Sequence, residues 1–410
     1  MAGTEREFDI VLWGASGFTG QLVAEYLLGR YGVDGAFRWA LGGRNEVKLD
    51  AVRDRLGAAE LPLVLGDGAD ADSMKSLAER TRVVCTTVGP YATYGSPLVA
   101  ACARAGTHYC DLTGELHWIR RMLDEHQETA RSSGARIVPT CGFDSIPSDL
   151  GVYYVQAAAR ERYGAPCPSV KCGVAGFSGG MSGGTVASML HMMEEAEGDR
   201  EIRRIMSDPY AINPQGEREG PDGPDRSAPA YDADLGQWTA PFMMAGINTR
   251  VVRRSAALLR DLYGPDFRYQ EAMLTGTGAA GALKASGVAV GMNAGMTAMA
   301  LGPVRRAVAP RLPAPGEGPS RQQQEAGYWD LRFFGAPPAG SEARPIQARL
   351  RGDRDPGYGS TSKMLGESAV CLAQDHLEAV TGFLTPAAAM GQSLIDRLQK
   401  NAGVSFEVTG

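Results

Sequence analysis

VLWGASGFTG, at residues 11–20, is a glycine-rich segment that separates two different apolar patterns. Before it, residues 8–13 are mostly apolar with little alternation, as in a strand buried on both faces of a parallel sheet. After it, QLVAEYLLGRYG repeats apolar residues at helical spacing. The order of strand, glycine turn and helix predicts a turn whose backbone N–H groups hold a phosphate.

The three glycines of this turn have separate expected tasks. Gly14 takes the tight backbone angles, Gly17 lets a pyrophosphate approach the main chain, and Gly20 lets the helix pack closely on the strand. Ser16 and Thr19 add hydroxyl donors. The spacing is G-x-x-G-x-x-G rather than G-x-G-x-x-G, so a glycine turn that serves packing alone is the alternative.

The residue after the second expected strand indicates which dinucleotide such a turn would hold. FRWALGGR, residues 37–44, reads as that strand, and Arg44 stands where an NAD enzyme usually has an acidic residue on the ribose. A guanidinium pairs well with the 2′-phosphate of NADP, and Lys48 follows one helical turn later. We therefore expect NADPH, with an ordinary exposed loop arginine as the alternative.

Strand-like and helical patterns continue to alternate up to residue 150. The further expected strands are LPLVLGD ending at Asp67, RVVCTTVGPY ending near Gly89 and Pro90, THYCDLTGE, and ARIVPTCGFDS. This alternation predicts an α/β fold, with a Rossmann-type doubly wound parallel sheet in residues 1–150. In such a sheet the ligand lies across the carboxyl ends of the strands.

After residue 150 the alternation dissolves, which predicts a second, α+β domain over residues 151–350 that receives the substrate. Within it, residues 213–232 are rich in proline, glycine and charge and are expected to form an exposed loop. Residues 351–410 return to helical patterns, with a threonine N-cap and a proline opening the last helix. We expect these helices to pack back onto the first domain.

Composition excludes several classes of protein. The 410-residue chain carries 41 basic and 47 acidic side chains, a net charge of −6, so no overall positive field attracts nucleic acid. The charged N-terminus lacks an apolar signal core, and seven cysteines without a C-x-x-C pair suggest reduced thiols in the cytoplasm. Five scattered histidines suggest no metal site.

The segment GFSGG, residues 176–180, competes with the dinucleotide reading because it matches the G-x-S-x-G elbow of hydrolases around Ser178. No HGGG-like oxyanion segment accompanies it, and further glycines delay the following helix, so a flexible glycine loop fits better. Opposite a nicotinamide, Ser178, Ser182 or Thr185 would offer hydroxyls to a substrate carbonyl.

Residues 285–302 form an uncharged stretch of eighteen residues that has three readings. It suits a buried or substrate-lining helix, a helix in contact with a lipid surface, or, least well because of its Gly, Asn and Thr, a membrane span. Met292, Met296 and Met299 recur at helical spacing and predict one adaptable apolar face.

Six segments together resemble the saccharopine dehydrogenase-like oxidoreductases, and especially their trans-acting enoyl reductase branch. The resemblance runs from about residue 7 to the C-terminus. The segments are GASGFTG (14–20), GPYATYGSPLVAACARAGTHYCDLTGE (89–115), CGFDSIPSDLG (141–151), GGTVASML (183–190), PGEGPS (315–320) and DPGYGSTSKMLGESA (355–369). The resemblance implies an NADPH-dependent reductase that acts on polyketide-derived or lipid-derived chains, small or carrier-bound. A saccharopine-like substrate is disfavoured because the second domain shows no arginine cluster for a dicarboxylate.

The resemblance also implies site residues. Residues near the pyrophosphate, the 2′-phosphate, the adenine and the nicotinamide ribose are Gly14, Ala15, Ser16, Gly17, Phe18, Thr19, Gly20, Arg44, Asp67, Gly89 and Pro90. The expected chemistry is hydride delivery to an unsaturated thioester. The resemblance does not fix the proton donor; the candidates, chosen by their place in the sequence, are Tyr94 first, then Tyr91 and the CGFDS group of Cys141, Asp144 and Ser145. Each donor has a structural alternative in packing or turn formation. A reductase of imines or ketones, and a lipid-associated NADP-binding protein without catalysis, are the competing functions.

Overall fold

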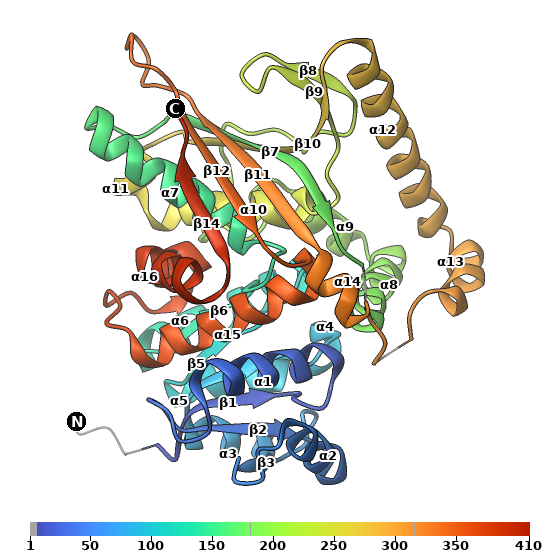
Figure 1. Ribbon diagram of the computed structural model, residues 1–410, viewed down its shortest axis with the longest axis vertical. Helices are drawn as coiled ribbons and strands as arrows, with labels where there is room; N and C mark the ends of the chain where they lie inside the picture. Colours follow the sequence, from blue (N-terminus) through green and yellow to red (C-terminus); the bar gives the residue numbers. More distant parts are fainter. Residues whose placement is uncertain (1–5, 181, 315) are drawn as a thin grey trace.

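The computed structural model describes residues 6–180, 182–314 and 316–410. Residues 1–5, Met181 of the glycine and serine loop, and Pro315 of the segment PGEGPS lie outside this described part. Two seven-stranded sheets lie one above the other in Figure 1, with helices between them. The first sheet is parallel and the second is mixed, so the expected α/β fold class is confirmed.

The first sheet has the strand order of a doubly wound fold, β13-β6-β5-β4-β1-β2-β3. All of its pairs are parallel, and the order reverses between β1 and β4, where such sheets bind their ligands. Its strands are β1 (Phe8–Trp13), β2 (Trp39–Gly43), β3 (Leu63–Leu65), β4 (Thr81–Thr86), β5 (His108–Cys110), β6 (Arg136–Val138) and β13 (Gly382–Phe383).

Strand β1 is buried on both faces, as its apolar run predicts. Ile10 and Leu12 join the core beneath one set of helices, and Val11 and Trp13 join the core on the other side. The first set is α1 (Phe18–Tyr31), α2 (Glu46–Leu56) and α15 (Thr361–Gln374). The second set is α3 (Ala71–Arg80), α5 (Ser96–Ala105) and α6 (Leu116–Ser133), with the short α4 (Tyr91–Tyr94) at the end of β4.

The second sheet has the order β14-β12-β11-β7-β10-β9-β8. Only β7 and β10 run parallel among its described pairs. Its strands are β7 (Ser169–Ser178), β8 (Ala230–Asp232), β9 (Gln237–Ala240), β10 (Arg268–Gly276), β11 (Tyr328–Gly335), β12 (Ile346–Gly352) and β14 (Val404–Val408). Helices α7 (Ile146–Tyr163), α10 (Ala245–Leu258) and α16 (Pro386–Asn401) fill the space between the sheets and share one core with the first.

The C-terminal segment contributes to both layers. Helix α15 packs on α1, and β13 pairs with β6 at the edge of the first sheet. Helix α16 packs on α7, and the final strand β14 pairs with β12 of the second sheet. The last part of the chain therefore ties the two sheets together.

The remaining helices are α8 (Gly183–Gly198), α9 (Arg200–Ser207), α11 (Arg260–Tyr263), α12 (Gly278–Ala300), α13 (Gly302–Val308), α14 (Arg321–Ala326), a 3-10 turn at Ala309–Arg311 and a π turn at Pro356–Ser360. Of these, α8, α9, α12, α13 and α14 lie at the right of Figure 1, and α11 lies at the left beside α7. In the described residues no single helix is long and apolar enough to span a bilayer. Helix α12 and the segment Gly302–Arg311 meet that test only together, with a bend of 102° between them.

A carboxyl group of the second sheet is buried among polar partners from three elements. Glu271 of β10 accepts hydrogen bonds from Ser148 of α7 (3.2 Å), Asn248 of α10 (2.9 Å) and the Tyr269 hydroxyl (3.1 Å). Its burial raises the pKa of Glu271 to about 7. The folded chain therefore keeps this proton at a pH where the unfolded chain has lost it.

We expect Glu271→Gln to make the free energy of unfolding less dependent on pH. In the wild type, the stability that comes from the protonated carboxyl is present below about pH 4 and is lost as pH rises towards 7. Glutamine accepts and donates in the same place without this loss, so the variant should gain about 1–3 kcal/mol over the wild type between pH 5 and 8. Urea unfolding at pH 5 and at pH 8 measures the free energy of unfolding of the wild type and the variant. Glu79→Gln is the control, because Glu79 is exposed. If all three proteins show the same pH dependence of this free energy, the prediction is wrong.

Candidate active site

The three glycines of the turn after β1 have different surroundings: two are closely packed and one borders open space. Gly14 has a φ of +88°, and a side chain there would stand 2.6 Å from Val88 of the neighbouring strand end. A side chain on Gly20 would overlap the carbonyl oxygen of Gly14. Gly17 is different: its φ is −74°, it is exposed, and the nearest atom to an added Cβ is 3.3 Å away. Two of the glycines are therefore needed for packing, and Gly17 borders free space.

The start of helix α1 directs its free N–H groups into this space. Gly17 donates to the Gly14 carbonyl (3.0 Å), and the helical ladder begins with Gln21 donating to Gly17 (2.9 Å). The N–H groups of the first helical turn, at residues 18–20, have no acceptor within the helix. Thr87 of the β4 end donates its hydroxyl to Gly14 (3.2 Å) and fixes the turn at the point where strand order reverses. An anion with close main-chain contact fits this cradle.

Arg44 and Asp67 lie at the carboxyl ends of β2 and β3, beside the glycine turn in the sheet order. The Arg44 side chain is exposed, and no hydrogen bond or ion pair reaches it from the described residues. Asp67 is also exposed and accepts a hydrogen bond from the backbone of Ala69 (3.0 Å). A guanidinium without an acidic partner is suited to a phosphate.

The two candidate tyrosines of α4 have different environments. Tyr91 is buried, stacks against Trp118 with ring centroids 5.5 Å apart, and donates its hydroxyl to the Thr86 carbonyl (3.3 Å). Burial raises the pKa of Tyr91 well above its usual value. Tyr94 is 44% exposed. Tyr91 therefore has a structural role that fixes α4 to the end of β4, and Tyr94 is the tyrosine of α4 that is accessible to solvent.

Helix α4 is fixed in place by a buried carboxylate that the sequence pattern does not single out. Glu115, in the loop after β5, accepts hydrogen bonds from the backbone N–H groups of Tyr91 (2.9 Å) and Ala92 (2.8 Å). This bond pair satisfies the start of α4 directly after Gly89 and Pro90. The carboxylate side chain therefore sets the path of the chain at the end of β4.

Asp144 lies in the loop after β6, and its carboxyl is half-buried. One of its oxygens is 3.9 Å from where a Cβ would stand on Gly114, in the loop after β5. Within the described residues no donor or cation reaches this carboxyl, and burial raises its pKa to about 6. Asp144 is thus an acid that is partly protonated near neutral pH at the ligand-binding edge of the sheet.

Segments that are far apart in sequence meet at Phe18 of the glycine turn. The ring of Tyr358 packs edge-on against Phe18, with centroids 5.2 Å apart. The Tyr358 hydroxyl accepts a hydrogen bond from the backbone N–H of Ser182 and lies 2.8 Å from the Thr185 hydroxyl. The start of α8 is therefore held directly above the turn.

The loop before α14 also packs against Phe18 and the start of α8. Gly183 donates to the Glu317 carbonyl (3.0 Å), and a side chain on Gly318 would overlap the Phe18 ring. A groove of about 730 Å³ opens here and is lined by Phe18, Arg311, Leu312, Pro313, Gly316, Glu317, Gly318, Pro319 and Ser320. Ser178 is exposed at the end of β7 and pairs with Tyr328 in the sheet. That position in an extended strand does not match the strand-to-helix elbow of a hydrolase.

Histidines that are scattered in sequence come together beside α4. His117 of α6 lies 2.8 Å from Glu195 of α8, and His191 lies 3.2 Å from the Thr93 hydroxyl and 3.7 Å from Glu195. Only the spacing of His191 and Glu195, one helical turn apart, hints at this cluster in the sequence. Among the described residues, no group of three or more His, Cys, Asp or Glu side chains is arranged to hold a metal ion.

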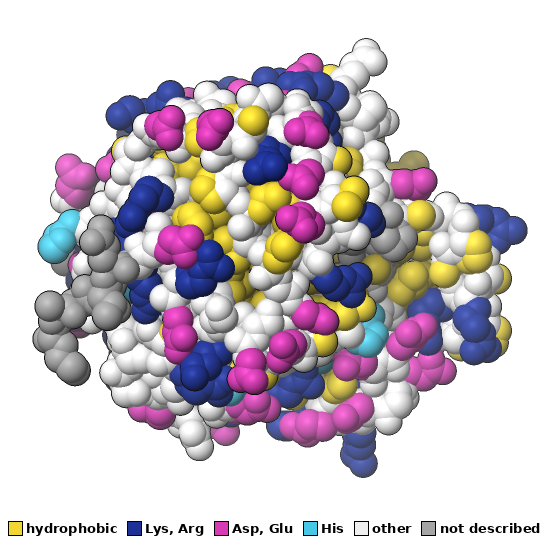
Figure 2. Space-filling model, turned by 90° about the horizontal axis from the view of Figure 1, so that it is seen from below, with side chains coloured by type: hydrophobic (Ala, Val, Ile, Leu, Met, Phe, Trp, Pro, Cys, Tyr) yellow, Lys and Arg dark blue, Asp and Glu magenta, His cyan; other side chains and the backbone are white. Residues whose placement is uncertain are grey.

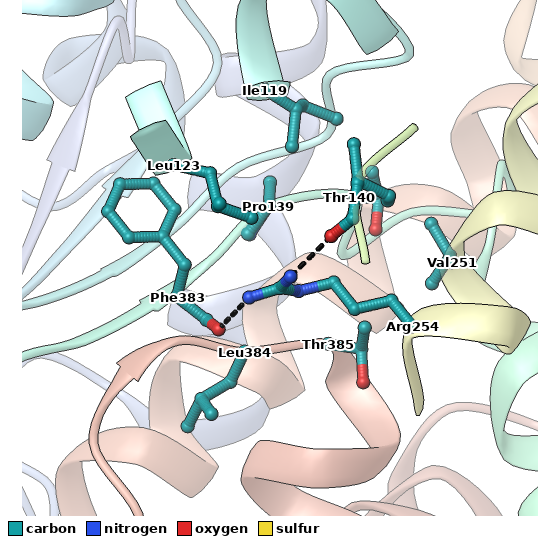
Figure 3. A pocket seen from close by; sticks show the side chains of 10 residues that line it. Ile119, Leu123, Pro139, Thr140, Val251, Arg254, Phe383, Leu384 and Thr385 are labelled. Atoms are coloured by element: carbon teal, nitrogen blue, oxygen red, sulfur yellow. Dashed lines mark hydrogen bonds between the residues drawn. The ribbon is translucent and has the colours of Figure 1, made fainter. Parts of the chain in front are cut away.

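A second cavity, of about 10 Å³, lies in the core rather than at the site. Figure 3 shows it around the buried side chain of Arg254, which donates to the carbonyl oxygen of Phe383 (2.6 Å) and to that of Ile212. Burial lowers the pKa of Arg254 to about 9. This arginine links α10 to β13 across the two layers and has no room for a ligand beside it.

Comparisons with known proteins agree with this architecture. Residues 10–138 match the family model described as saccharopine dehydrogenase NADP binding domain. A Mycobacterium tuberculosis protein provisionally named a trans-acting enoyl reductase is 45% identical, covering 100% of this chain and 99% of its own. The trans-acting enoyl reductase of Mycobacterium ulcerans is 39% identical, covering 98% of both chains. In fold, apo saccharopine dehydrogenase (L-Glu forming) from Saccharomyces cerevisiae is similar, with a TM-score of 0.50 at 13% identity, over 98% of this chain and 100% of that one.

Proposed function

We propose a reaction for this chain on the premise that it belongs to the saccharopine dehydrogenase-like family and is an NADP-dependent oxidoreductase of the trans-acting enoyl reductase branch. The proposed reaction is reduction of a carbon–carbon double bond next to the carbonyl of a thioester. The acyl chain would be polyketide-derived or lipid-derived and either small or carrier-bound. The observation that carries the proposal is the unpartnered carboxyl of Asp144, whose raised pKa makes it a proton donor at the ligand-binding edge.

The proposed cofactor site uses the open side of the glycine turn. Residues 14–20 would hold the pyrophosphate through main-chain N–H groups, with the Ser16 and Thr19 hydroxyls beside them. Arg44 would bind the 2′-phosphate, and Asp67 would border the adenine. Gly89 and Pro90 would border the nicotinamide ribose, since they lie in the loop that follows β4, next to the reversal of strand order.

When bound, NADPH supplies the hydride that adds to the β-carbon of the substrate. The chain's own part is to hold the carbonyl and supply the proton. Asp144 would donate its carboxyl proton to the α-carbon. The exposed Thr185 hydroxyl, which lies 2.8 Å from that of Tyr358, would donate to the carbonyl oxygen and stabilise charge there while Tyr358 donates to Thr185. Ser182 would act indirectly, because its side chain caps α8 by accepting from the Thr185 N–H (3.4 Å). Tyr94 is the competing donor, since it is accessible.

The proposed place of action is the cytoplasm. All seven cysteines are buried and free, which suits a reducing compartment. A screen of NADPH oxidation tests the reaction itself, with enoyl thioesters, imines and ketones of several chain lengths as substrates. The proposal expects turnover of enoyl thioesters; turnover of imines or ketones alone, or binding of NADPH without any turnover, would replace it by one of the competing functions.

We expect Arg44→Ala to reduce the preference for NADPH over NADH. A charge-assisted contact with the 2′-phosphate is worth about 1.5–3 kcal/mol, which corresponds to roughly 10-fold to 150-fold in affinity. Titration of both cofactors against wild type and variant measures the ratio of dissociation constants. Arg30→Ala is the control, because Arg30 lies at the far end of α1 and pairs with Asn401. An unchanged ratio in Arg44→Ala means that this side chain does not read the 2′-phosphate.

A further inference from the structure

Helix α12 combines an apolar sequence with an exposed position. A helix that is apolar on all sides is normally covered by protein or lipid. Residues 285–302 contain no charge, yet the buried residues of α12 are only Gly281, Ala285 and Ala289, which face β9 and β10. Leu283 is 77% exposed, Val290 69%, and Leu301, after the helix, 56%. Much of α12 therefore has no protein cover within the described residues.

The charges within this segment of the sequence have one sign. Residues 272–316 contain no aspartate or glutamate, although the whole chain has a net charge of −6. The segment carries Lys284, Arg306 and Arg311 at exposed positions. A fourth basic residue, Arg305, is buried and pairs with Glu197 of α8 (2.6 Å), so it fixes α13 to the body of the protein. The segment's own exposed charges are thus positive, while the exposed carboxylates of Glu194 and Glu197 on α8 lie beside Arg305.

We propose that residues 278–311, which comprise α12, α13 and the 3-10 turn that follows and are called the arm from here on, dock on an anionic lipid surface. The arm lies at the edge of the molecule in Figure 1, and the lobe at the right of Figure 2 carries hydrophobic and basic side chains together. Exposed apolar side chains enter the headgroup region, and each nearby basic residue strengthens binding to an anionic surface by roughly fivefold. The bend of 102° between α12 and the following segment means that the two do not form one straight span.

Charge favours lipid over a second copy of the chain. Two arms placed face to face would bring Lys284, Arg306 and Arg311 against the same three cations of the other copy. An anionic bilayer provides opposite charge and an apolar layer in one partner. The inference goes beyond the proposed reaction and does not depend on it, because docking is measured without any substrate.

Flotation with lipid vesicles tests the arm in the full-length protein. We expect binding to phosphatidylcholine vesicles that contain 30% phosphatidylglycerol, and at least tenfold weaker binding to phosphatidylcholine alone or in 0.5 M salt. The double variant Val290→Glu/Leu301→Glu should lose at least tenfold in vesicle binding. Val380→Glu is the matched control, because Val380 is 41% exposed and lies outside the arm.

A second pair of variants tests the charges. Lys284→Gln/Arg306→Gln should weaken binding to the anionic vesicles by about tenfold or more, whereas the exposed Lys75→Gln should not. The thermal shift with NADPH should stay unchanged in every variant, which shows that the fold and the cofactor site persist. Absence of wild-type binding to either vesicle overturns the proposal. So does light scattering that shows a wild-type dimer converted to a monomer by the Val290 and Leu301 changes, since the arm would then cover a second copy.

Discussion

Gly17→Val should abolish NADPH binding while the protein stays folded. A branched side chain at this position would occupy the open space in front of α1, where the pyrophosphate is expected to touch the main chain. The backbone tolerates the change, since the φ of −74° is accessible to valine and the added Cβ meets no atom closer than 3.3 Å. Thermal unfolding with and without NADPH measures the effect. At a hundredfold excess over its dissociation constant, the cofactor should stabilise the wild type by about 2.7 kcal/mol and the variant not at all.

The matched control for this prediction is Gly20→Val, three residues further on. There an added side chain would overlap the Gly14 carbonyl, so we expect a loss of stability in the absence of any cofactor. The two variants therefore separate binding from packing within one turn. A Gly17→Val protein that still responds fully to NADPH, or a wild type whose unfolding temperature does not move, would refute the turn as a dinucleotide cradle.

Asp144→Asn should lower kcat for the enoyl substrate by about 10²-fold to 10⁴-fold, the usual contribution of a positioned general acid. The dissociation constant of NADPH should change little, because Asp144 follows β6 and lies away from the glycine turn after β1. A stopped-flow assay of NADPH oxidation gives kcat, and fluorescence titration gives the dissociation constant.

The pH dependence distinguishes proton donation from a structural role. Burial raises the pKa of Asp144 to about 6, so the protonated acid is lost as pH rises above 6 and the wild-type rate should fall towards pH 8. Asp144→Asn should remove this fall, and Asp144→Glu should restore it in part. Tyr94→Phe tests the competing donor. If kcat falls by about 10²-fold or more in Tyr94→Phe and does not fall in Asp144→Asn, Tyr94 is the donor.

Short-range features were predictable from the chain alone. The glycine turn depends on the conformational freedom of Gly14, and the strands that precede Arg44 and Asp67 depend on local apolar periodicity. The same local patterns predicted the doubly wound first sheet. The uncharged stretch at 285–302 is helical up to Ala300, but only Ala285 and Ala289 of this part are buried, so the expectation of a buried helix does not hold for most of it. Whether a helix face is covered depends on what packs against it, and the stretch itself does not contain that information.

Long-range contacts and proton affinities depended on the tertiary structure. Tyr358 lies against Phe18, Glu115 holds the start of α4, and His117 meets Glu195, although these pairs are separated by tens to hundreds of residues. No local pattern encodes such pairs, because they form only when the two sheets and α8 are assembled. The same holds for Asp144: its residue type was visible in CGFDS, but the loss of water that raises its pKa arises from the elements packed around it. Sequence therefore proposed the candidate groups for the chemistry, and packing determined which of them are buried, tethered or exposed.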